Sequence, residues 1–281
     1  MRSRWFALAA LLAIVAGFLA QPSLLAQWLR QPTEGVPRTR DGKPNLSAPA
    51  PRTREGKPDF SGIWMTGNPL PCNNATGADF QDCGSELPLA REGLNIGASL
   101  PGGLPFQPWA ADLVKRRVLR QAQDDPHARC LPDTFLRAYG LPHMMKFVQV
   151  PGLLVVLDEM NASYRQVFTD GRALPVDPTP AWNGYSSGKW TGDTLVVQTA
   201  GFRDDLWLDI NGSPLTDAAK VTERFRRLDY GHLAIDLTVD DAKAYTRPWT
   251  VALKQAIVVD TDLVDEICLE NEKSVQHMIG K

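Results

Sequence analysis

The sequence has no surplus of positive charge. It contains 30 Lys and Arg residues against 32 Asp and Glu residues, a formal net charge of −2. Proteins that bind nucleic acid neutralise phosphates with clustered basic residues, so this balance gives no reason to expect nucleic acid as a partner. Histidine is scarce too, and its four residues are scattered without a metal-ligand spacing such as H-x-x-x-H. We therefore expect neither a nucleic-acid partner nor a cofactor.

Cysteine is limited to four residues, and none of them belongs to a C-x-x-C pair. Zinc sites usually need such spacing, whereas an even number of cysteines in an oxidising compartment favours disulfides. Of the possible pairings we favour Cys72–Cys83, which closes a short loop, and Cys130–Cys268, which ties the end of the chain to its middle.

The N-terminus has the pattern of a secretory signal. Two arginines in the first four residues precede the uncharged segment from Trp5 to Ala20. This segment is shorter than the roughly 20 residues of a membrane-spanning helix. Ala20 and Ala26 suit cleavage, but neither forms a clean A-x-A site, so residues 1–26 are a cleaved signal peptide or an uncleaved anchor. We expect a periplasmic or extracellular protein that touches the membrane only through a retained anchor.

Residues 27–58 contain almost no periodic apolar residues. A fourteen-residue phrase occurs twice, as PRTRDGKPNLSAPA from Pro37 and as PRTREGKPDFSGIW from Pro51. Such a stretch buries too little apolar surface to offset its ordering entropy. We predict a disordered tether over 27–58 and a single β-rich domain over 59–281. Deleting residues 37–50 should then leave the melting temperature nearly unchanged.

The chain after Met145 alternates apolar and polar residues, the pattern of half-buried strands. In LAIDLTV, residues 233–239, every second side chain is apolar. Short turns such as Pro151-Gly152 and Gly192-Asp193 separate the runs, as in hairpins. The pattern predicts a mainly β domain built as an antiparallel meander. A closed barrel is favoured over a sandwich because closure removes exposed strand edges.

One helix-length pattern precedes the strands, and it begins at Pro108, which suits a first helical turn. Apolar residues share one predicted side: Trp109, Leu113, Val114 and Val118. Basic residues make up the opposite side: Lys115, Arg116, Arg117 and Arg120. That basic side is either a contact for an anionic membrane or ligand, or a solvated helix face, which is the commoner case.

The segment Gly62-Ile63-Trp64 resembles the Gly-x-Trp signature of the lipocalins and the wider calycins. The resemblance implies a barrel that Trp64 closes at one end, beneath an arginine of a later strand, with Arg224 or Arg247 as candidates. A second resemblance spans residues 51–272 and includes GKPDFSGIW, YRQVFTDGR and GYSSGKWTGDTLVVQTAGF. These motifs are similar to a widespread group of secreted proteins from acidobacteria and metagenomes. That likeness implies secretion and a single domain, and it transfers no activity.

Aromatic residues at strand ends suggest a ligand-binding mouth. Such a mouth, with a charged side chain to orient a polar group, suits a small apolar or amphipathic molecule. The candidate ligand-binding residues are Trp64, Tyr164, Arg165, Trp190, Trp207, Glu223, Arg224 and Trp249. Our leading hypothesis is an exported lipocalin-like protein that binds or carries such a ligand. A structural or partner-binding envelope protein is the alternative if side chains fill the barrel.

Two motifs support weaker alternatives. GYSSG fits G-x-S-x-G with Ser186 at its centre, but a nucleophile elbow needs a helix after the serine, and a strand pattern follows here. A secreted hydrolase or isomerase would use Ser186 or a pocket histidine, His143 or His232, and we lean toward a binding protein instead. Asp209 and Asn211 suggest a calcium loop, although their spacing does not match an EF-hand and Asn211-Gly212 is typical of a turn.

Overall fold

The computed structural model describes residues 32–67 and 91–270 of the chain. The expected signal or anchor segment and the predicted pair Cys72–Cys83 lie outside these residues. No helix in the described ranges is long and apolar enough to cross a membrane.

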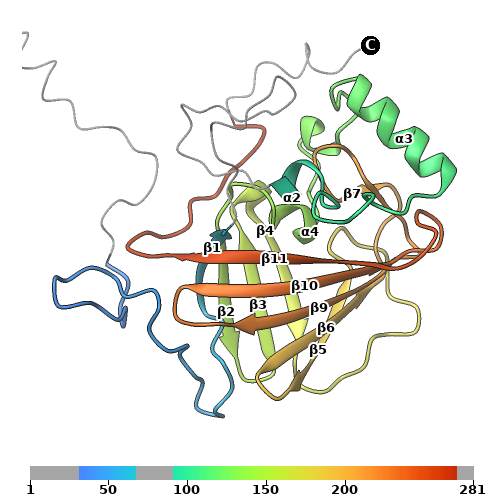
Figure 1. Cartoon of the computed structure of the whole chain (residues 1–281). Helices are drawn as coiled ribbons and strands as arrows, with labels where there is room; N and C mark the ends of the chain where they lie inside the picture. The colour runs from blue at the N-terminus through green and yellow to red at the C-terminus, as the bar shows by residue number, and fades with distance from the viewer. Residues whose placement is uncertain (1–31, 68–90, 271–281) are drawn as a thin grey trace, which may run out of the picture.

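A closed barrel forms the body of the protein (Figure 1). Its strands, in order around the barrel, are β1 (Gly62–Thr66), β11 (Trp249–Val258), β10 (His232–Asp240), β9 (Lys220–Arg227), β6 (Thr194–Ala200), β5 (Tyr185–Thr191), β4 (Ser163–Phe168), β3 (Leu153–Asp158) and β2 (Met145–Val150). The predicted mainly β barrel is confirmed, and β1 closes it by pairing with both β11 and β2.

The predicted meander of hairpins is interrupted twice. Strands β4 and β5 run parallel, through Val167–Ser186 and Phe168–Ser187, whereas all other neighbours in the barrel are antiparallel. Parallel neighbours need a crossover instead of a tight turn, and residues 169–184 supply it. Between β6 and β9 the chain forms a separate two-stranded sheet of β7 (Leu206–Trp207) and β8 (Pro214–Leu215).

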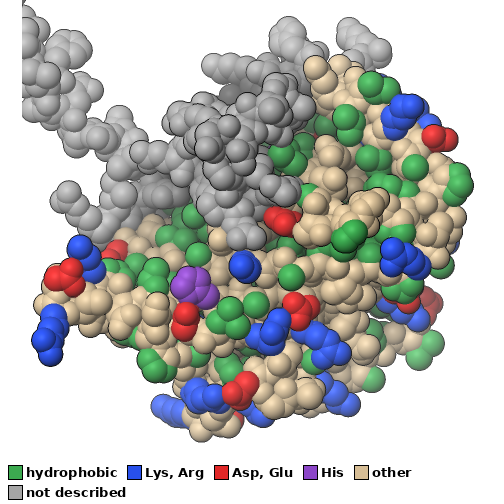
Figure 2. All heavy atoms as spheres, viewed as in Figure 1, with side chains coloured by type: hydrophobic (Ala, Val, Ile, Leu, Met, Phe, Trp, Pro, Cys, Tyr) green, Lys and Arg blue, Asp and Glu red, His purple; other side chains and the backbone are tan. Residues whose placement is uncertain are grey.

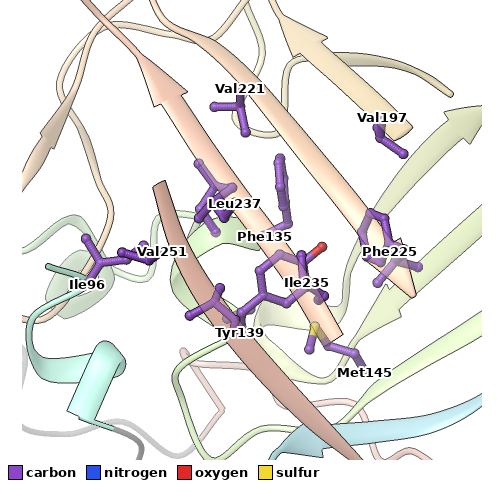
Figure 3. Close-up of a cluster of buried hydrophobic side chains, with 14 of the residues drawn as sticks. Ile96, Phe135, Tyr139, Met145, Val197, Val221, Phe225, Ile235, Leu237 and Val251 are labelled. Atoms are coloured by element: carbon purple, nitrogen blue, oxygen red, sulfur yellow. The ribbon is translucent and has the colours of Figure 1, made fainter. Parts of the chain in front are cut away.

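Alternation along the strands builds the core. On β10 the buried side chains are Leu233, Ile235, Leu237 and Val239, as the sequence predicts. Figure 3 shows Ile235 and Leu237 facing Tyr139, Phe225 and Met145 in the interior. Burial of these side chains at about 25 cal/mol per Å2 of apolar surface is the main force that stabilises the barrel.

Short helices lie at one end of the barrel, in the order α2 (Arg91–Leu94), α3 (Pro108–Leu119) and α4 (Phe135–Ala138) (Figure 1). All four residues of α4 are buried, and Thr134 caps the helix by accepting a hydrogen bond from the Arg137 backbone N–H. Two 3-10 turns, Pro126–Arg129 and Met160–Ala162, complete this end. Helix α4 therefore places its side chains inside the barrel, while α3 stands outermost.

The duplicated phrase forms two copies of the same turn. In each copy a threonine and a lysine share a backbone hydrogen bond, Thr39 with Lys43 at 2.9 Å and Thr53 with Lys57 at 2.8 Å. The glycine of each turn has a positive φ, 81° in the first copy and 76° in the second, where a residue with Cβ would be strained. Residues 32–58 thus have a defined conformation, and the prediction of a disordered tether is wrong for them.

The first copy also packs on the barrel. Backbone carbonyls of Leu46 and Ala48 accept hydrogen bonds from Gly231 and Tyr230, both 2.7 Å long, in the turn between β9 and β10. Ala48 is buried in the core. The expectation of a tether failed because Pro-rich turns can be ordered by backbone hydrogen bonds to a preformed sheet, without apolar periodicity of their own.

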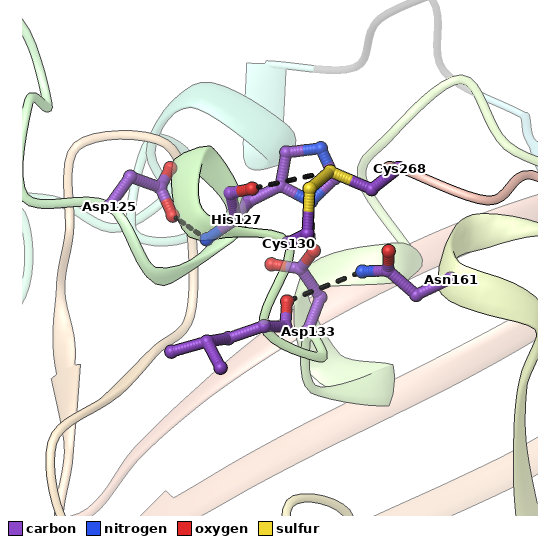
Figure 4. The surroundings of a disulfide bond; sticks show 7 residues. Asp125, His127, Cys130, Asp133, Asn161 and Cys268 are labelled. Carbon is purple, nitrogen blue, oxygen red and sulfur yellow. Dashed lines mark hydrogen bonds and ion pairs between the residues drawn. A yellow bond between two sulfur atoms is a disulfide. The ribbon is translucent and has the colours of Figure 1, made fainter. Parts of the chain in front are cut away.

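The C-terminal segment is held by a disulfide. Cys130 and Cys268 are bonded, which confirms that pairing, and Figure 4 shows the bond beside His127 and Asp133. His127 contacts Asp133 through Nδ1 at 2.6 Å, and this hydrogen bond raises the pKa of His127 against the effect of its partial burial.

Candidate functional site

An ion pair occupies the barrel interior. Arg165 on β4 donates to both carboxylate oxygens of Glu223 on β9, and the two side chains are 2% and 0% exposed. The Tyr139 hydroxyl donates to the same carboxylate at 2.7 Å, and burial raises its pKa well above the ordinary value. The Arg165 guanidinium also lies 3.4 Å from the centre of the Phe135 ring. Helix α4 and the residue after it thus seal this pair from solvent.

Ser186 belongs to the same buried network. Its Oγ accepts a hydrogen bond from Arg165 Nε at 3.1 Å and lies 2.9 Å from Thr199 Oγ1. The residue is 1% exposed, and β6 follows its strand where an elbow would need a helix. The G-x-S-x-G match therefore marks a strand of the barrel wall, and this buried Ser186 has no access to substrate in the structure.

Trp64 closes the other end of the barrel, beneath Arg227. The guanidinium lies 4.9 Å from the ring centre, and Trp64 Nε1 donates to the Phe60 carbonyl at 2.9 Å. The prediction that Arg224 or Arg247 lies over Trp64 is wrong, because Arg227 takes that place. Residues of β9 alternate in burial, so Arg227 points inward with Glu223, whereas Arg224 points outward.

The remaining tryptophans do not meet at one mouth. Trp207 is buried against Arg117, whose guanidinium lies 4.3 Å from the ring centre. Trp249 is buried against Tyr245, with the ring centres 5.4 Å apart. Trp190 lines a cleft.

The weaker catalytic and metal candidates occupy structural positions. His232 contacts Asp229 at 2.7 Å on the surface, and His143 contacts Glu266 at 3.3 Å with a pKa lowered by burial. Asp209 accepts hydrogen bonds from the Ser213 backbone and hydroxyl and from the Ile96 backbone, so it orders two loops. Asn211 lies in the adjoining turn. Within residues 32–67 and 91–270, no group of three or more His, Cys, Asp or Glu residues could hold a metal ion.

A cleft of about 590 Å3 opens at the Trp64 end of the barrel, and we call it the end cleft. Its floor is apolar, because Leu154 and Leu195 contribute buried side chains and Trp190 contributes its ring. Its lining residues are Thr53, Arg54, Glu55, Lys57, Asp59, Gln149, Val150, Pro151, Gly152, Leu154, Thr169, Trp190 and Leu195. One wall is therefore the second copy of the duplicated turn, and the other is the β2–β3 hairpin.

The second copy is fastened across the barrel end from two sides. Arg52 makes a bidentate contact with Asp193, at 3.0 and 2.6 Å, and Lys57 Nζ donates to the Gly192 carbonyl at 3.2 Å. On the other side, Gln149 accepts from the Phe60 backbone at 2.8 Å and donates to the Pro58 carbonyl at 3.2 Å. These contacts fix the wall and leave the cleft open between them.

The two copies differ in the hydrogen bonds that the threonine hydroxyl makes. In the first copy the Thr39 hydroxyl bonds to the Asp41 carboxylate and to the Lys43 carbonyl. In the second copy Glu55 replaces aspartate, and the buried Thr53 hydroxyl has no hydrogen-bond partner among the described residues. A buried unsatisfied hydroxyl costs about 1–3 kcal/mol, so a molecule in the cleft that reached this atom would recover that cost.

Phe60 stiffens the floor of the end cleft. Its ring is stacked on Trp190, with centres 5.4 Å apart and an angle of 10° between the planes, and Lys57 Nζ lies 5.8 Å from the Trp190 ring centre. Sequence reasoning identified Trp190 and missed Thr53, Arg54 and Lys57. The signal was present in the second copy of the phrase, which differs from the first at the position of Glu55.

Tyr164 lines a separate cleft of about 470 Å3 on the outside of β3 and β4, together with Asp158. Burial raises the pKa of Asp158 to about 7. A third cleft, of about 580 Å3, lies between residues 32–35, which precede the first copy, and strands β1 and β11. These three clefts lie outside the packed interior that contains Arg165 and Glu223.

Comparisons with protein-family models, curated proteins and solved structures give no significant match for this chain.

Proposed function

We propose that the protein binds a small amphipathic molecule in the end cleft. The observation that carries this proposal is the combination of an apolar floor, made by Leu154, Leu195 and Trp190, with the buried hydroxyl of Thr53, which has no hydrogen-bond partner in the described part of the chain. Ligand pockets in proteins have this make-up, mostly apolar walls with a few polar groups that fix orientation. Both Arg54 and Glu55 lie on the rim, so a polar head group finds donors and an acceptor there.

The proposal moves the ligand from the barrel interior to the barrel end. The interior contains the satisfied ion pair of Arg165 and Glu223 beneath α4, together with the packed core. This filling favours a second candidate function, a structural or partner-binding envelope protein, for which the end cleft would be incidental.

A titration with 8-anilinonaphthalene-1-sulfonate, an amphipathic aromatic probe, tests the proposal. We expect saturable fluorescence enhancement that dodecanoate displaces. Arg54→Ala on the rim should weaken binding, while Arg40→Ala, the same position in the first copy, should not. Loss of one hydrogen bond to a charged group corresponds to about 1.5–3 kcal/mol, about ten- to a hundredfold in Kd.

A conservative variant tests the role of the threonine. Glu55→Asp gives the second copy the residue of the first, where aspartate bonds to the threonine hydroxyl. We expect this variant to fold normally and to bind the probe more weakly, because the Thr53 hydroxyl then has an internal partner. Equal affinities for all variants, or no saturable binding by the folded protein, would contradict the proposal and favour the structural role.

We infer that the protein is exported. The Cys130–Cys268 disulfide supports this, because disulfides persist in oxidising compartments, and so does the basic and apolar pattern before Ala20. Mass spectrometry of the chain from a periplasmic fraction tests it. A chain found only in the cytosolic fraction with both cysteines reduced would contradict export, and the mass also shows whether residues 1–26 are retained.

A further inference from the structure

Helix α3 presents large apolar side chains to solvent. The exposed fractions are 47% for Trp109, 49% for Val118 and 74% for Leu119. The predicted apolar side therefore does not pack inward as a whole. In its place Ala110 and Arg117 are the buried residues of the helix.

Arg117 fixes this orientation. Its guanidinium donates to the Gly212 carbonyl at 2.7 Å and to Asp205 at 2.6 Å, and it lies over the Trp207 ring. The side chain is 4% exposed although it sits within a run of basic residues. Because the buried Arg117 anchors the helix, its neighbours Val118 and Leu119 face outward. The helix thus buries a cation and exposes two apolar side chains to water.

The exposed surface of α3 is also basic. Lys115, Arg116 and Arg120 are all exposed beside Val118 and Leu119, and Asp112 is the exposed acidic residue of the helix. Figure 1 shows α3 standing apart from the barrel, and Figure 2 shows hydrophobic and basic side chains mixed over that part of the surface. The helix dipole stabilises cations near a helix C-terminus, which accounts for the basic residues. It does not account for the exposure of Val118 and Leu119.

We propose that α3 docks the domain on an anionic lipid surface. A helix that lies in a membrane interface combines apolar side chains, which enter the acyl boundary, with Lys and Arg, whose stems reach back to the phosphates. Trp109 donates its ring N–H to the Lys243 carbonyl at 2.8 Å, and the rest of its half-exposed ring adds apolar surface at the start of the helix. The three exposed cations complement anionic head groups, and this charge pairing separates a lipid surface from an uncharged apolar partner.

Hydrogen–deuterium exchange of the full chain tests the proposal locally. Amides of residues 109–120 are followed with vesicles of phosphatidylcholine alone and with vesicles that also contain phosphatidylglycerol. The two arginines before the N-terminal apolar segment also favour anionic vesicles, so the charge variants of the helix are needed to separate the two contributions. We expect protection of 109–120 by the anionic vesicles, at a lipid concentration about a hundredfold lower than for phosphatidylcholine, from three cations near the surface. Added salt should reduce this difference.

Two matched variants complete the test. Lys115→Gln/Arg116→Gln/Arg120→Gln should abolish the preference for anionic vesicles, while Lys220→Gln/Arg224→Gln/Lys254→Gln, which removes as many exposed cations from the strands, should keep it. Val118→Ser/Leu119→Ser should reduce protection while retaining the charge. The proposal is overturned if anionic vesicles do not protect 109–120, or if the strand variant loses the preference as fully as the helix variant.

Discussion

The carboxylate of Glu223 lies against the guanidinium of Arg165, and neither group reaches solvent. Removing one partner leaves an unpaired charge in the interior, so we expect Glu223→Gln to lower the free energy of unfolding by about 3–5 kcal/mol. Urea unfolding, with the slope as well as the midpoint, measures this loss.

The double variant Arg165→Met/Glu223→Leu is the control. It leaves no buried charge, and Ser186 and Thr199 keep their contact with each other. We expect its free energy of unfolding to be closer to that of the wild type than that of Glu223→Gln. A double variant as unstable as the single one would show that the pair is needed as a whole for packing.

Asp158 gives the protein a pH dependence of stability. Burial raises its pKa from 3.8 to about 7 in the folded state, so the folded state binds the proton more tightly. The contribution of this bound proton to the free energy of unfolding is complete below pH 3.8 and is lost as the pH rises through about 7. Asp158→Asn keeps an oxygen acceptor for the Met160 backbone N–H. We expect this variant to be more stable than the wild type above pH 7, by up to about 4 kcal/mol.

Thermal unfolding of both proteins between pH 4 and pH 8 checks this expectation. The difference between wild type and Asp158→Asn isolates this one group from His127, whose pKa is also raised. Parallel curves over that range would mean that Asp158 is already ionised in the folded protein.

The Cys130–Cys268 disulfide joins residues 138 positions apart. In the chain-entropy picture, such a long loop contributes about 4–5 kcal/mol to the free energy of unfolding. We expect Cys130→Ala/Cys268→Ala to lose that amount and to become sensitive to proteolysis after Val258. Calorimetry gives the first quantity and limited digestion with mass spectrometry the second. An unchanged digestion pattern would show that the segment is held without the disulfide, by the contacts of Lys146 with Asp262 and of Glu159 and His143 with residues 264–266.

The first copy of the duplicated phrase should stabilise the barrel. Deleting residues 37–50 removes the backbone hydrogen bonds from Gly231 and Tyr230 to this copy and uncovers core surface at Ala48. We expect the melting temperature to fall by about 5–10 °C, against the nearly unchanged value that a tether predicts. Arg40→Ala, at an exposed position of the same copy, is the control and should melt like the wild type.

The alternation of apolar and polar residues along the chain was enough to predict much of the fold. Leu233 and Ile235 were assigned to the inner face of β10 from the period of the sequence alone, and the structure agrees. The same period predicts that Arg227 points into the barrel, because it lies an even number of residues from the inward-facing Val221 and Phe225. Arg224 lies an odd number of residues from them and points outward. That signal was available from the eight residues of β9 and needed no tertiary information.

The site depended on contacts that no local pattern records. Arg52 meets Asp193 across 141 positions of sequence, and Gln149 meets Phe60 across 89. Both contacts form because closure of the barrel brings the β2–β3 and β5–β6 turns to one end, where the second copy can cross them. Composition alone could not show this, since a Pro-rich turn has the same letters whether it is solvated or docked.

The sequence by itself determined that the domain is mainly β and which residues of β10 face inward, because strand period is a local property. It favoured a closed barrel and the Cys130–Cys268 pairing among the alternatives, and the structure has both. Only the tertiary structure decided that Ser186 is sealed beneath α4 and that Arg117 turns inward from a basic helix. It also decided that the first copy of the repeated turn packs on the turn between β9 and β10, while the second copy forms a wall of the end cleft. Each of these depends on which distant backbone groups and side chains a closed barrel leaves within hydrogen-bonding reach.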